Sequence, residues 1–197
     1  MNTVNPASGE KSYLRDYFKE KRSKLCEDIE RKNALDAEIQ TRLIISPEYR
    51  KAKAVLVYLA LPYEISTSMI IHAALTNNKI VALPVCINDG EMVFRQITDL
   101  SGLRPGSYGI LEPDESCPEY TPAEGDICVC PSLCCDMRGY RLGYGGGYYD
   151  RFLKSFKGVK AALCYSESII PSIEADEYDV GMDMIHTDSF TRYIRQA

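Results

Sequence analysis

Histidine is scarce in this sequence, because the 197 residues include only His72 and His186. A metal centre built mainly from histidine side chains is therefore not expected. The sequence also lacks an excess of positive charge: 28 acidic residues outweigh 23 lysines and arginines, and the formal net charge is −5. An acidic surface repels nucleic acids and anionic membranes, so we expect neither as a partner, and any basic site must be local.

Long apolar segments are missing as well. No apolar run approaches the roughly 20 residues that span a bilayer, and the stretch Met1-Asn2-Thr3-Val4-Asn5-Pro6 lacks the apolar region of a signal peptide. We therefore predict a cytoplasmic protein. The length fits one domain with room for a substantial core, and we assign residues 1–197 to a single domain.

Cysteine, by contrast, is abundant, with eight residues. Half of them lie within or beside strand-like apolar runs, where a reduced cysteine behaves as a small buried hydrophobe: Cys86, Cys128, Cys130 and Cys164. The alternative is a zinc site made by Cys128, Cys130, Cys134 and Cys135. Their spacing is not that of a C-x-x-C knuckle, and Cys128 and Cys130 alternate with Ile127 and Val129 as in a buried strand, so we favour packing over zinc.

The most distinctive stretch is Arg141-Leu142-Gly143-Tyr144-Gly145-Gly146-Gly147-Tyr148-Tyr149-Asp150-Arg151. Dense glycine allows backbone N–H groups to converge on an anion, and a loop that leads into a helix is a favourable phosphate site. The run matches neither the P-loop nor the Rossmann fingerprint, so a glycine-rich surface turn is the alternative. Arg141 and Asp150 favour the phosphate interpretation, because arginine binds phosphate oxygens and a carboxylate can hold the accompanying magnesium.

The first third of the chain is expected to be helical. Residues from Ser8, a possible cap, to about Glu30 have the apolar spacing of an amphipathic helix, and a second helix is predicted from Asp36 to Ile45, ended by Pro47. Lys11 and Arg15 lie one turn apart on the first helix. They form either part of a solvated face or a pair directed at a phosphate.

The rest of the sequence alternates between strands and helices. Continuous or alternating apolar runs predict six strands, at Val55–Leu59, Ile80–Val85, Glu91–Ile97, Ile127–Pro131, Val159–Tyr165 and Phe190–Ile194. Helices are predicted after a cap at Ser66 or Thr67 and over Tyr148–Phe156, and 102–125 is predicted to be a long ordered loop. This order indicates an α/β fold.

Glu64 follows the first predicted strand, in a loop of the kind that forms the binding crevice of an open α/β sheet. Two interpretations of Glu64 stay open at this point. The carboxylate either meets the start of the following helix, or it accepts hydrogen bonds from the N–H groups of a heterocyclic ligand.

Taken together, these motifs resemble the 5-formyltetrahydrofolate cyclo-ligase family over nearly the whole chain. The resemblance rests on Lys11-x-x-x-Arg15, Glu64-Ile65-x-Thr67, Tyr108-Gly109-Ile110-x-Glu112-Pro113, the run from Asp136 to Arg151, and Asp179-x-x-x-Asp183. It implies a three-layer α/β/α sandwich with a mostly parallel sheet, related in outline to sugar isomerases and CoA transferases. It also implies ring closure of 5-formyltetrahydrofolate, with or without a polyglutamate tail, to 5,10-methenyltetrahydrofolate by a monomer.

The resemblance further implies ATP as co-substrate, Mg²⁺ as cofactor and a phosphorylated formyl intermediate, because the formyl oxygen is a poor leaving group until it is phosphorylated. Catalytic roles fall to Arg141 and Lys11, and the metal ligands would be Asp150 and Asp179. The folate would contact Leu59, Glu64 and Tyr148. The ATP-binding set would be Lys11, Arg15, Arg141, Leu142, Gly143, Tyr144, Gly145, Gly146, Gly147, Tyr148 and Tyr149.

This chain departs from some family members at Tyr144 and Gly146, where a basic residue can stand inside the glycine run. Neutralisation of the phosphates would therefore depend more on Arg141 and on the pair in the first helix. Two rival functions use similar features. One is a sugar-phosphate isomerase or CoA transferase, which would need neither ATP nor magnesium, and the other is a folate- or nucleotide-binding regulatory protein without turnover.

Overall fold

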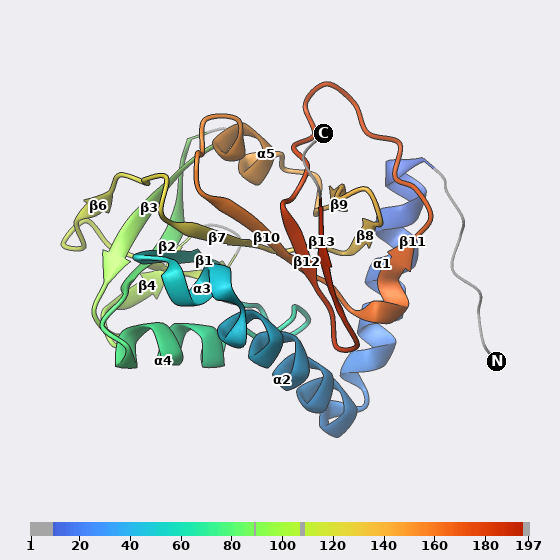
Figure 1. Ribbon diagram of the computed structural model, residues 1–197, viewed down its shortest axis with the longest axis horizontal. Helices are drawn as coiled ribbons and strands as arrows, with labels where there is room; N and C mark the ends of the chain where they lie inside the picture. Colours follow the sequence, from blue (N-terminus) through green and yellow to red (C-terminus); the bar gives the residue numbers. More distant parts are fainter. Residues whose placement is uncertain (1–9, 89, 107–108, 195–197) are drawn as a thin grey trace.

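The computed structural model describes residues 10–88, 90–106 and 109–194. Its main element is an eight-stranded sheet (Figure 1). Across the sheet the strands are β13 (Thr191–Tyr193), β12 (Met184–His186), β10 (Val159–Leu163), β7 (Ile127–Cys130), β1 (Ala54–Val57), β2 (Ile80–Asn88), β3 (Glu91–Ile97) and β6 (Glu119–Tyr120). The strands from β12 to β2 run parallel, and β13, β3 and β6 are antiparallel additions at the edges.

Helices lie on both faces of this sheet. They are α1 (Lys11–Cys26), α2 (Ile29–Ile45), α3 (Pro47–Lys51), α4 (Ser68–Thr76), α5 (Tyr148–Leu153) and the 3-10 helix η2 (Ser166–Ser168). Helices α2, α3 and α4 cover one face, and α5 covers the other (Figure 1). The mostly parallel α/β/α arrangement predicted from the sequence is thus confirmed. Among the described residues, none of the helices has both the length and the apolar character needed to cross a bilayer.

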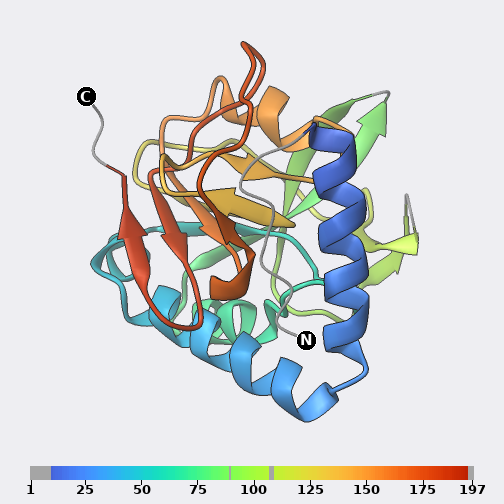
Figure 2. The same cartoon turned by 90° about the vertical axis from the view of Figure 1, so that its right-hand side faces the viewer.

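Helix α1 packs beside the main sheet, against a second, three-stranded sheet (Figure 2). The strands of this small sheet are β11 (Ile169–Ile170), β8 (Cys134–Asp136) and β9 (Arg141–Leu142). Leu14 and Phe18 of α1 are fully buried against Leu133 and Leu142. This packing brings the basic residues of α1 next to the glycine run, which begins at β9.

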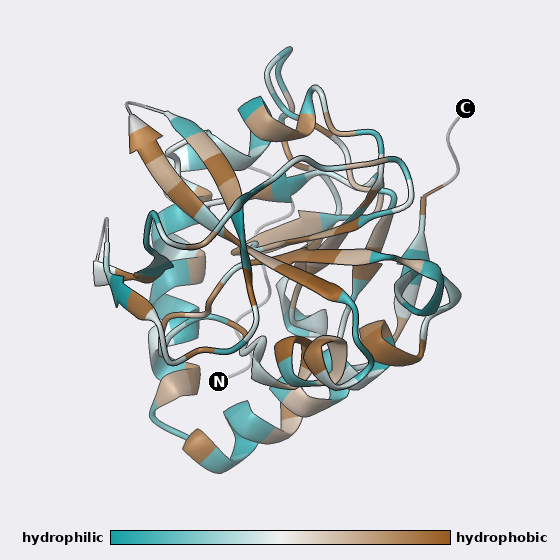
Figure 3. Cartoon of the chain, turned by 90° about the vertical axis from the view of Figure 1, so that its left-hand side faces the viewer, coloured by the Kyte–Doolittle hydropathy of each residue, from teal (hydrophilic) through white to brown (hydrophobic). Residues whose placement is uncertain are grey.

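Side chains along the buried strands point alternately to the two faces of the sheet, so the core has two parts. Hydrophobic colouring runs along the central strands in Figure 3 and over much of α4, while hydrophilic colouring is common on the loops. Val55 and Ile127 face α2 and α4, whereas Leu56 and Cys128 face α5, as the two-residue period of a strand requires. Cys128, Cys130 and Cys164 are buried as predicted, while Cys86 is only partly buried.

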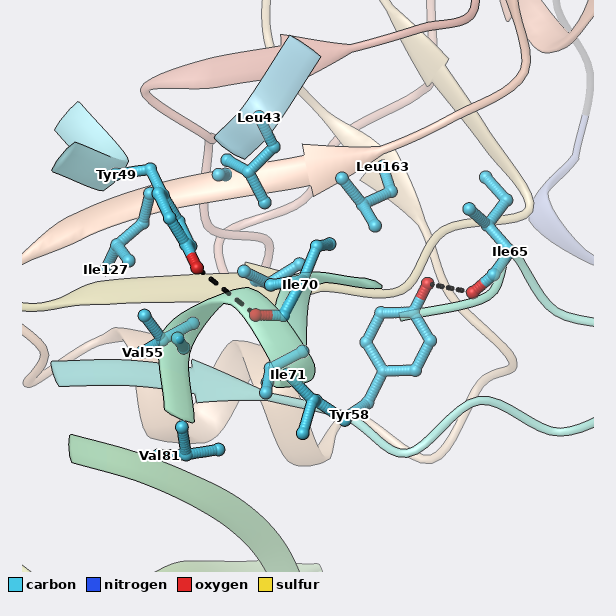
Figure 4. Close-up of a cluster of buried hydrophobic side chains, with 14 of the residues drawn as sticks. Leu43, Tyr49, Val55, Tyr58, Ile65, Ile70, Ile71, Val81, Ile127 and Leu163 are labelled. Carbon is cyan, nitrogen blue, oxygen red and sulfur yellow. Dashed lines mark hydrogen bonds between the residues drawn. The ribbon is translucent and has the colours of Figure 1, made fainter. Parts of the chain in front are cut away.

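Two tyrosines complete the larger core cluster without leaving their hydroxyl groups unpaired (Figure 4). Tyr49 donates a hydrogen bond to the Ile70 carbonyl oxygen at 3.2 Å, and Tyr58 donates to the Ile65 carbonyl oxygen at 2.9 Å. The second bond ties the loop after β1 to the core. Because Glu64 precedes Ile65, this bond helps to fix the position of Glu64.

Several predicted boundaries were wrong. The first helix ends at Cys26 and α2 begins at Ile29, because the Asp28 carboxylate caps α2 by accepting from Arg31 N at 3.0 Å. The predicted cap Ser8 lies outside the described residues. Thr67 occupies the cap position of α4, but its hydroxyl donates to the Tyr58 carbonyl oxygen at 2.7 Å instead of capping. The predicted loop 102–125 contains β6 and a hairpin of β4 (Leu103–Pro105) and β5 (Leu111–Pro113).

Candidate active site

A cleft of about 970 Å³ opens beyond the carboxyl ends of the parallel strands, where the chain leaves β1 and β7. This is the edge at which open α/β sheets bind ligands. All the site residues predicted from the sequence line this one cleft: Lys11, Arg15, Leu59, Glu64, Arg141, Leu142, Gly143, Tyr144, Gly145, Gly146, Gly147, Tyr148, Tyr149, Asp150 and Asp179. The fold therefore brings together residues that are up to 168 positions apart in the sequence.

The glycine run forms one wall of the cleft. Gly145 has φ of +104° and Gly147 has φ of +70°, and side chains rarely tolerate these backbone conformations. Arg15 of α1 donates from Nε to the Gly143 carbonyl oxygen at 3.1 Å, and Arg151 donates from Nη2 to the Gly146 carbonyl oxygen at 2.6 Å. The two arginines hold the carbonyl groups, so the loop is fixed before any ligand arrives.

Arg141 lies at the base of this wall and is 7% exposed. Its Nη1 donates to Asp150 Oδ1 at 3.1 Å and to the Val180 carbonyl oxygen at 3.3 Å. The guanidinium carbon is 5.9 Å from the centre of the Tyr149 ring, and Val180 N also donates to Asp150 Oδ1, at 3.1 Å. The cation predicted for a phosphate and the carboxylate predicted for a metal are thus paired with each other.

Lys11 is paired in a similar way. Its Nζ lies 2.7 Å from Asp176 Oδ2 and 2.5 Å from Asp179 Oδ2. Partial burial acts to lower the pKa of Lys11, but the hydrogen bonds and charges of Asp176 and Asp179 outweigh it and raise the pKa above its ordinary value. Asp176 was not among the predicted residues. Its position three residues before Asp179, in a segment rich in acidic residues, was the only sequence signal for it.

Glu64 marks the other end of the cleft and is 7% exposed. Its Oε2 accepts a hydrogen bond from Leu61 N at 2.9 Å. Burial raises the pKa of Glu64, although the Leu61 N–H, Arg22, Tyr144 and Lys32 oppose that rise. Leu59 and Tyr148, predicted to contact the same ligand as Glu64, also line the cleft. The residues thus combine a charged region at the glycine run with a buried carboxylate at the far end.

A buried ion pair supports the Glu64 loop from behind. Lys32 Nζ lies 2.7 Å from Asp36 Oδ2 and donates to the Glu64 carbonyl oxygen at 2.8 Å. Asp36 Oδ2 also accepts from Ser66 N at 3.1 Å, and Asp36 Oδ1 accepts from the Tyr165 hydroxyl at 2.6 Å. The pair holds the backbone on both sides of Ile65, and the sequence pattern gave no indication of it.

The carboxylates of the cleft fit a hard cation such as magnesium, because Mg²⁺ prefers oxygen ligands and is usually bound by one or two carboxylates together with substrate phosphates. Within the described ranges, no group of three or more His, Cys, Asp and Glu side chains could hold a metal ion. Asp150 lies in the first turn of α5 and Asp179 in the segment before β12, and the two are neighbours, since the residue after Asp179 donates to Asp150. This donor set fits an ion that arrives with a phosphate ligand.

The fold and the cleft define an α/β protein with a wall of glycines, arginines and a lysine next to a buried carboxylate. A comparison with known families assigns it more narrowly. The model of the 5-formyltetrahydrofolate cyclo-ligase family matches residues 7–188, and the chain belongs to this family. The family resemblance inferred from the sequence motifs is thereby confirmed.

Named relatives and solved structures agree with this assignment. The 5-formyltetrahydrofolate cyclo-ligase of Mus musculus is 31% identical over 162 residues, covering 75% of this chain and 80% of the relative. That of Haemophilus influenzae is 30% identical over 139 residues, covering 68% and 74%. The solved structure of Aquifex aeolicus 5,10-methenyltetrahydrofolate synthetase aligns with a TM-score of 0.81 at 31% identity, covering 95% of this chain and 94% of that one.

Proposed function

We propose that the protein closes the ring of 5-formyltetrahydrofolate to give 5,10-methenyltetrahydrofolate, with ATP as the co-substrate that activates the formyl group. Family membership supports the reaction. The observation that carries the proposal for this chain is that all the residues assigned by the resemblance line one cleft. The cleft volume of about 970 Å³ also lies at the upper end of the range of ligand sites in proteins, about 300–1,000 Å³.

The charged half of the cleft is proposed to bind ATP. Lys11, Arg15 and Arg141 would contact the phosphate oxygens, for which lysine and arginine are well suited, and the glycine run would donate from its backbone. In the described residues nothing accepts a hydrogen bond from the N–H groups of Gly145 and Gly146. These donors are therefore available to an anion.

Magnesium would be held by Asp150 and Asp179, where it would neutralise charge on the phosphates and orient them. The ion pairs of the cleft provide an argument for it. Arg141 is paired with Asp150, and Lys11 with Asp176 and Asp179, so the cations are already balanced by carboxylates. ATP adds several negative charges to this balanced set. A magnesium ion held by Asp150 and Asp179 would offset part of this charge, and Lys11 and Arg141 would then contact the phosphates.

The buried half is proposed to bind the pterin. Glu64 would accept hydrogen bonds from pterin N–H groups, while Leu59 and Tyr148 would line the folate pocket. In the reaction the formyl oxygen attacks the γ-phosphorus, and the bond from that phosphorus to the ADP oxygen breaks. N10 then attacks the activated formyl carbon and loses its proton, and the bond from carbon to the phosphate oxygen breaks to release phosphate. Positioning and charge neutralisation are the main contributions of the protein.

The two rival functions differ in observable ways. An isomerase or CoA transferase would turn over without ATP. A regulatory binding protein would bind both ligands without forming a product. Both rival functions have less support than the proposed one, because the chain belongs to the cyclo-ligase family and has a residue of the required type at each assigned position.

Absorbance of the methenyl product tests the proposal when the protein is mixed with 5-formyltetrahydrofolate and ATP, with and without Mg²⁺. We expect the methenyl absorbance to rise only when ATP and Mg²⁺ are both present. Substrate labelled with ¹⁸O in the formyl group should transfer the label to inorganic phosphate. Product formation without ATP, or binding of both ligands without product, would refute the proposed function.

A pair of substitutions separates the two halves. Arg15→Met removes a charged phosphate contact, worth about 1.5–3 kcal/mol, and should raise the KM for ATP roughly 10-fold or more with little change for folate. Glu64→Gln should raise the KM for 5-formyltetrahydrofolate instead, because the amide nitrogen cannot accept a hydrogen bond. Equal effects of each variant on both substrates would contradict this division of the cleft.

The remaining parts of the proposal are the oligomeric state of the protein, its location and the form of folate that it accepts. We propose that the chain acts as a single-domain monomer in the cytoplasm and accepts folate with or without a polyglutamate tail. The eight-stranded sheet supports a single domain, since it takes strands from both halves of the sequence. Size-exclusion chromatography with light scattering measures the oligomeric state, and a dimer mass would reject a monomer.

A further inference from the structure

Arg22 is a buried cation directly behind the wall of the cleft. It lies on α1 and is 5% exposed, in the apolar stripe that also includes Phe18 and Leu25. Its Nη2 donates to the Ser132 carbonyl oxygen at 2.7 Å, and its guanidinium carbon is 5.6 Å from the centre of the Tyr165 ring. Among the described residues, no carboxylate forms an ion pair with Arg22. Burying a charge without a direct counterion costs free energy, so we expect Arg22 to have a role that offsets this cost.

The second arm of this guanidinium reaches the cleft. Arg22 Nη1 donates to the Tyr144 hydroxyl at 3.1 Å. Tyr144 belongs to the glycine run, lines the cleft, and packs edge-on against Tyr63 with the ring centres 6.1 Å apart. Tyr144 also acts on the Glu64 side chain as a hydrogen-bonding neighbour, in the direction that lowers the pKa of that carboxyl. Since the hydroxyl accepts from Arg22, its own proton is available for the Glu64 carboxylate.

The three residues therefore form a continuous chain from Arg22 on α1, through Tyr144 in the glycine run, to Glu64 in the loop after β1. The Leu61 N–H donates to Glu64 Oε2 at 2.9 Å, so Leu61 and Tyr144 together orient this carboxylate. Arg22 and Tyr144 both act to lower the pKa of Glu64, against the larger effect of burial. They thus help to keep Glu64 ionised in a site that favours the neutral acid.

We propose that Arg22 is a positioning residue of the folate pocket, which acts through the Tyr144 hydroxyl to hold the Glu64 carboxylate ready to accept hydrogen bonds from the substrate. This inference rests on the proposed folate-binding role of Glu64. Arg22 does not touch the substrate itself.

A purely structural role for Arg22 predicts different behaviour. If Arg22 only joined α1 to the Ser132 loop, its removal would lower the melting temperature and weaken both ligands together. If it acts through Tyr144 on Glu64, its removal weakens folate selectively. It also shifts the pH dependence of folate binding, because a Glu64 that has lost these hydrogen bonds takes up a proton at higher pH and no longer binds an N–H group.

The test measures the affinity for 5-formyltetrahydrofolate by titration calorimetry from pH 5 to pH 9, and the affinity for a non-hydrolysable ATP analogue with Mg²⁺ at neutral pH. The variants are Arg22→Met, Tyr144→Phe and the double variant. Lys24→Met is the matched control, because it removes one positive charge from the same helix at a side chain that is 68% exposed. Comparing each variant with the wild-type chain cancels the titration of the folate itself.

Several other charged or titratable groups act on Glu64 and stay in place in every variant. They are Lys32 from α2, Tyr58 and Tyr63 from the segment after β1, and Tyr149 from α5. A change in the pH profile of Arg22→Met or Tyr144→Phe is therefore assigned to the Arg22 and Tyr144 connection. Because Tyr144→Phe leaves Arg22 in place, it tests the connection even if Arg22→Met fails to fold.

Arg22→Met and Tyr144→Phe are each expected to weaken folate about 10-fold at neutral pH and to raise the pH below which affinity falls, with at most a twofold change for the ATP analogue. The double variant should lose no more than the stronger single variant, since both break one connection. Additive losses, an unmoved pH profile, or equal weakening of both ligands would overturn the inference. A wild-type chain that binds no 5-formyltetrahydrofolate would instead refute the proposed function.

Discussion

The pair Lys32 and Asp36 provides a direct test of how burial determines the strength of an ion pair in this fold. Lys32→Met removes a side chain whose Nζ lies 2.7 Å from Asp36 Oδ2, where the two side chains are 10% and 3% exposed. The Asp36 carboxylate then stays buried without its cation. Breaking a buried pair in this way costs about 3–5 kcal/mol, which is a large part of the roughly 5–15 kcal/mol that stabilises a typical domain.

The chain contains a matched control on α1. Glu20 and Lys24 also lie four residues apart, with an N to O distance of 2.6 Å, but both side chains are 68% exposed. Their acid-first order is also the better one for a helix, so local helix effects alone would favour Glu20–Lys24 over Lys32–Asp36. Lys24→Met should therefore cost less than about 1 kcal/mol, because exposed pairs contribute little.

Urea unfolding followed by circular dichroism measures both variants, with the slope checked for two-state behaviour. In thermal unfolding, Lys32→Met should lower the Tm by about 6–20 °C at roughly 2–4 °C per kcal/mol, and Lys24→Met by a few degrees at most. Folate affinity should fall only in Lys32→Met, because Lys32 also holds the Glu64 carbonyl oxygen at 2.8 Å. If the two variants lose equal stability, burial does not determine the strength of these pairs, and our reasoning is wrong.

Two further predictions concern buried polar groups. Burial, aided by Arg42, lowers the pKa of His186 to about 4, whereas the unfolded chain has the ordinary value of about 6.5. The unfolded state binds the extra proton between these values, so stability should fall by about 3 kcal/mol as the pH drops from 6.5 to 4. Urea unfolding should show that His186→Gln loses less stability than the wild-type chain over this pH range. A His72→Gln control should lose as much stability as the wild-type chain. If His186→Gln also loses as much as the wild-type chain, the prediction is wrong. The Tyr149 hydroxyl is buried in the cleft wall with no hydrogen-bond partner among the described residues. Tyr149→Phe should therefore leave stability unchanged or raise it by about 1 kcal/mol in urea unfolding, while weakening folate or the ATP analogue at least threefold in calorimetry; unchanged affinity for both would reject a ligand contact.

The central part of the fold was predictable because its strands are buried on both faces. Continuous apolar runs such as Ile127–Cys130 can only be satisfied inside a covered sheet. The strands of the small sheet were missed because they have only two or three residues each, too few to show a period. The break between α1 and α2 was predicted too late in the sequence because the cap is made by one side chain, Asp28, while apolar residues continue on both sides of it.

The candidate site was predicted from family motifs, and residues outside those motifs were not found. Arg22 was not among the predicted site residues, since charged residues of an amphipathic helix usually face water. Its spacing from Phe18 and Leu25 placed it in the buried stripe, and this was the signal available in the sequence. Whether such a position holds a buried cation depends on partners such as the Ser132 carbonyl oxygen, which lies 110 residues away.

The most direct test of the central claim is a crystal structure of the protein with a non-hydrolysable ATP analogue, Mg²⁺ and 5-formyltetrahydrofolate. We expect the terminal phosphate to lie between Arg15 and the Gly143–Gly147 loop. Lys11 and Arg141 should no longer form ion pairs with the carboxylates that they contact without ligands. We also expect the pterin N–H groups on Glu64, with the formyl oxygen facing the terminal phosphorus. A structure in which the nucleotide binds elsewhere, or in which the pterin does not contact Glu64, would contradict this claim.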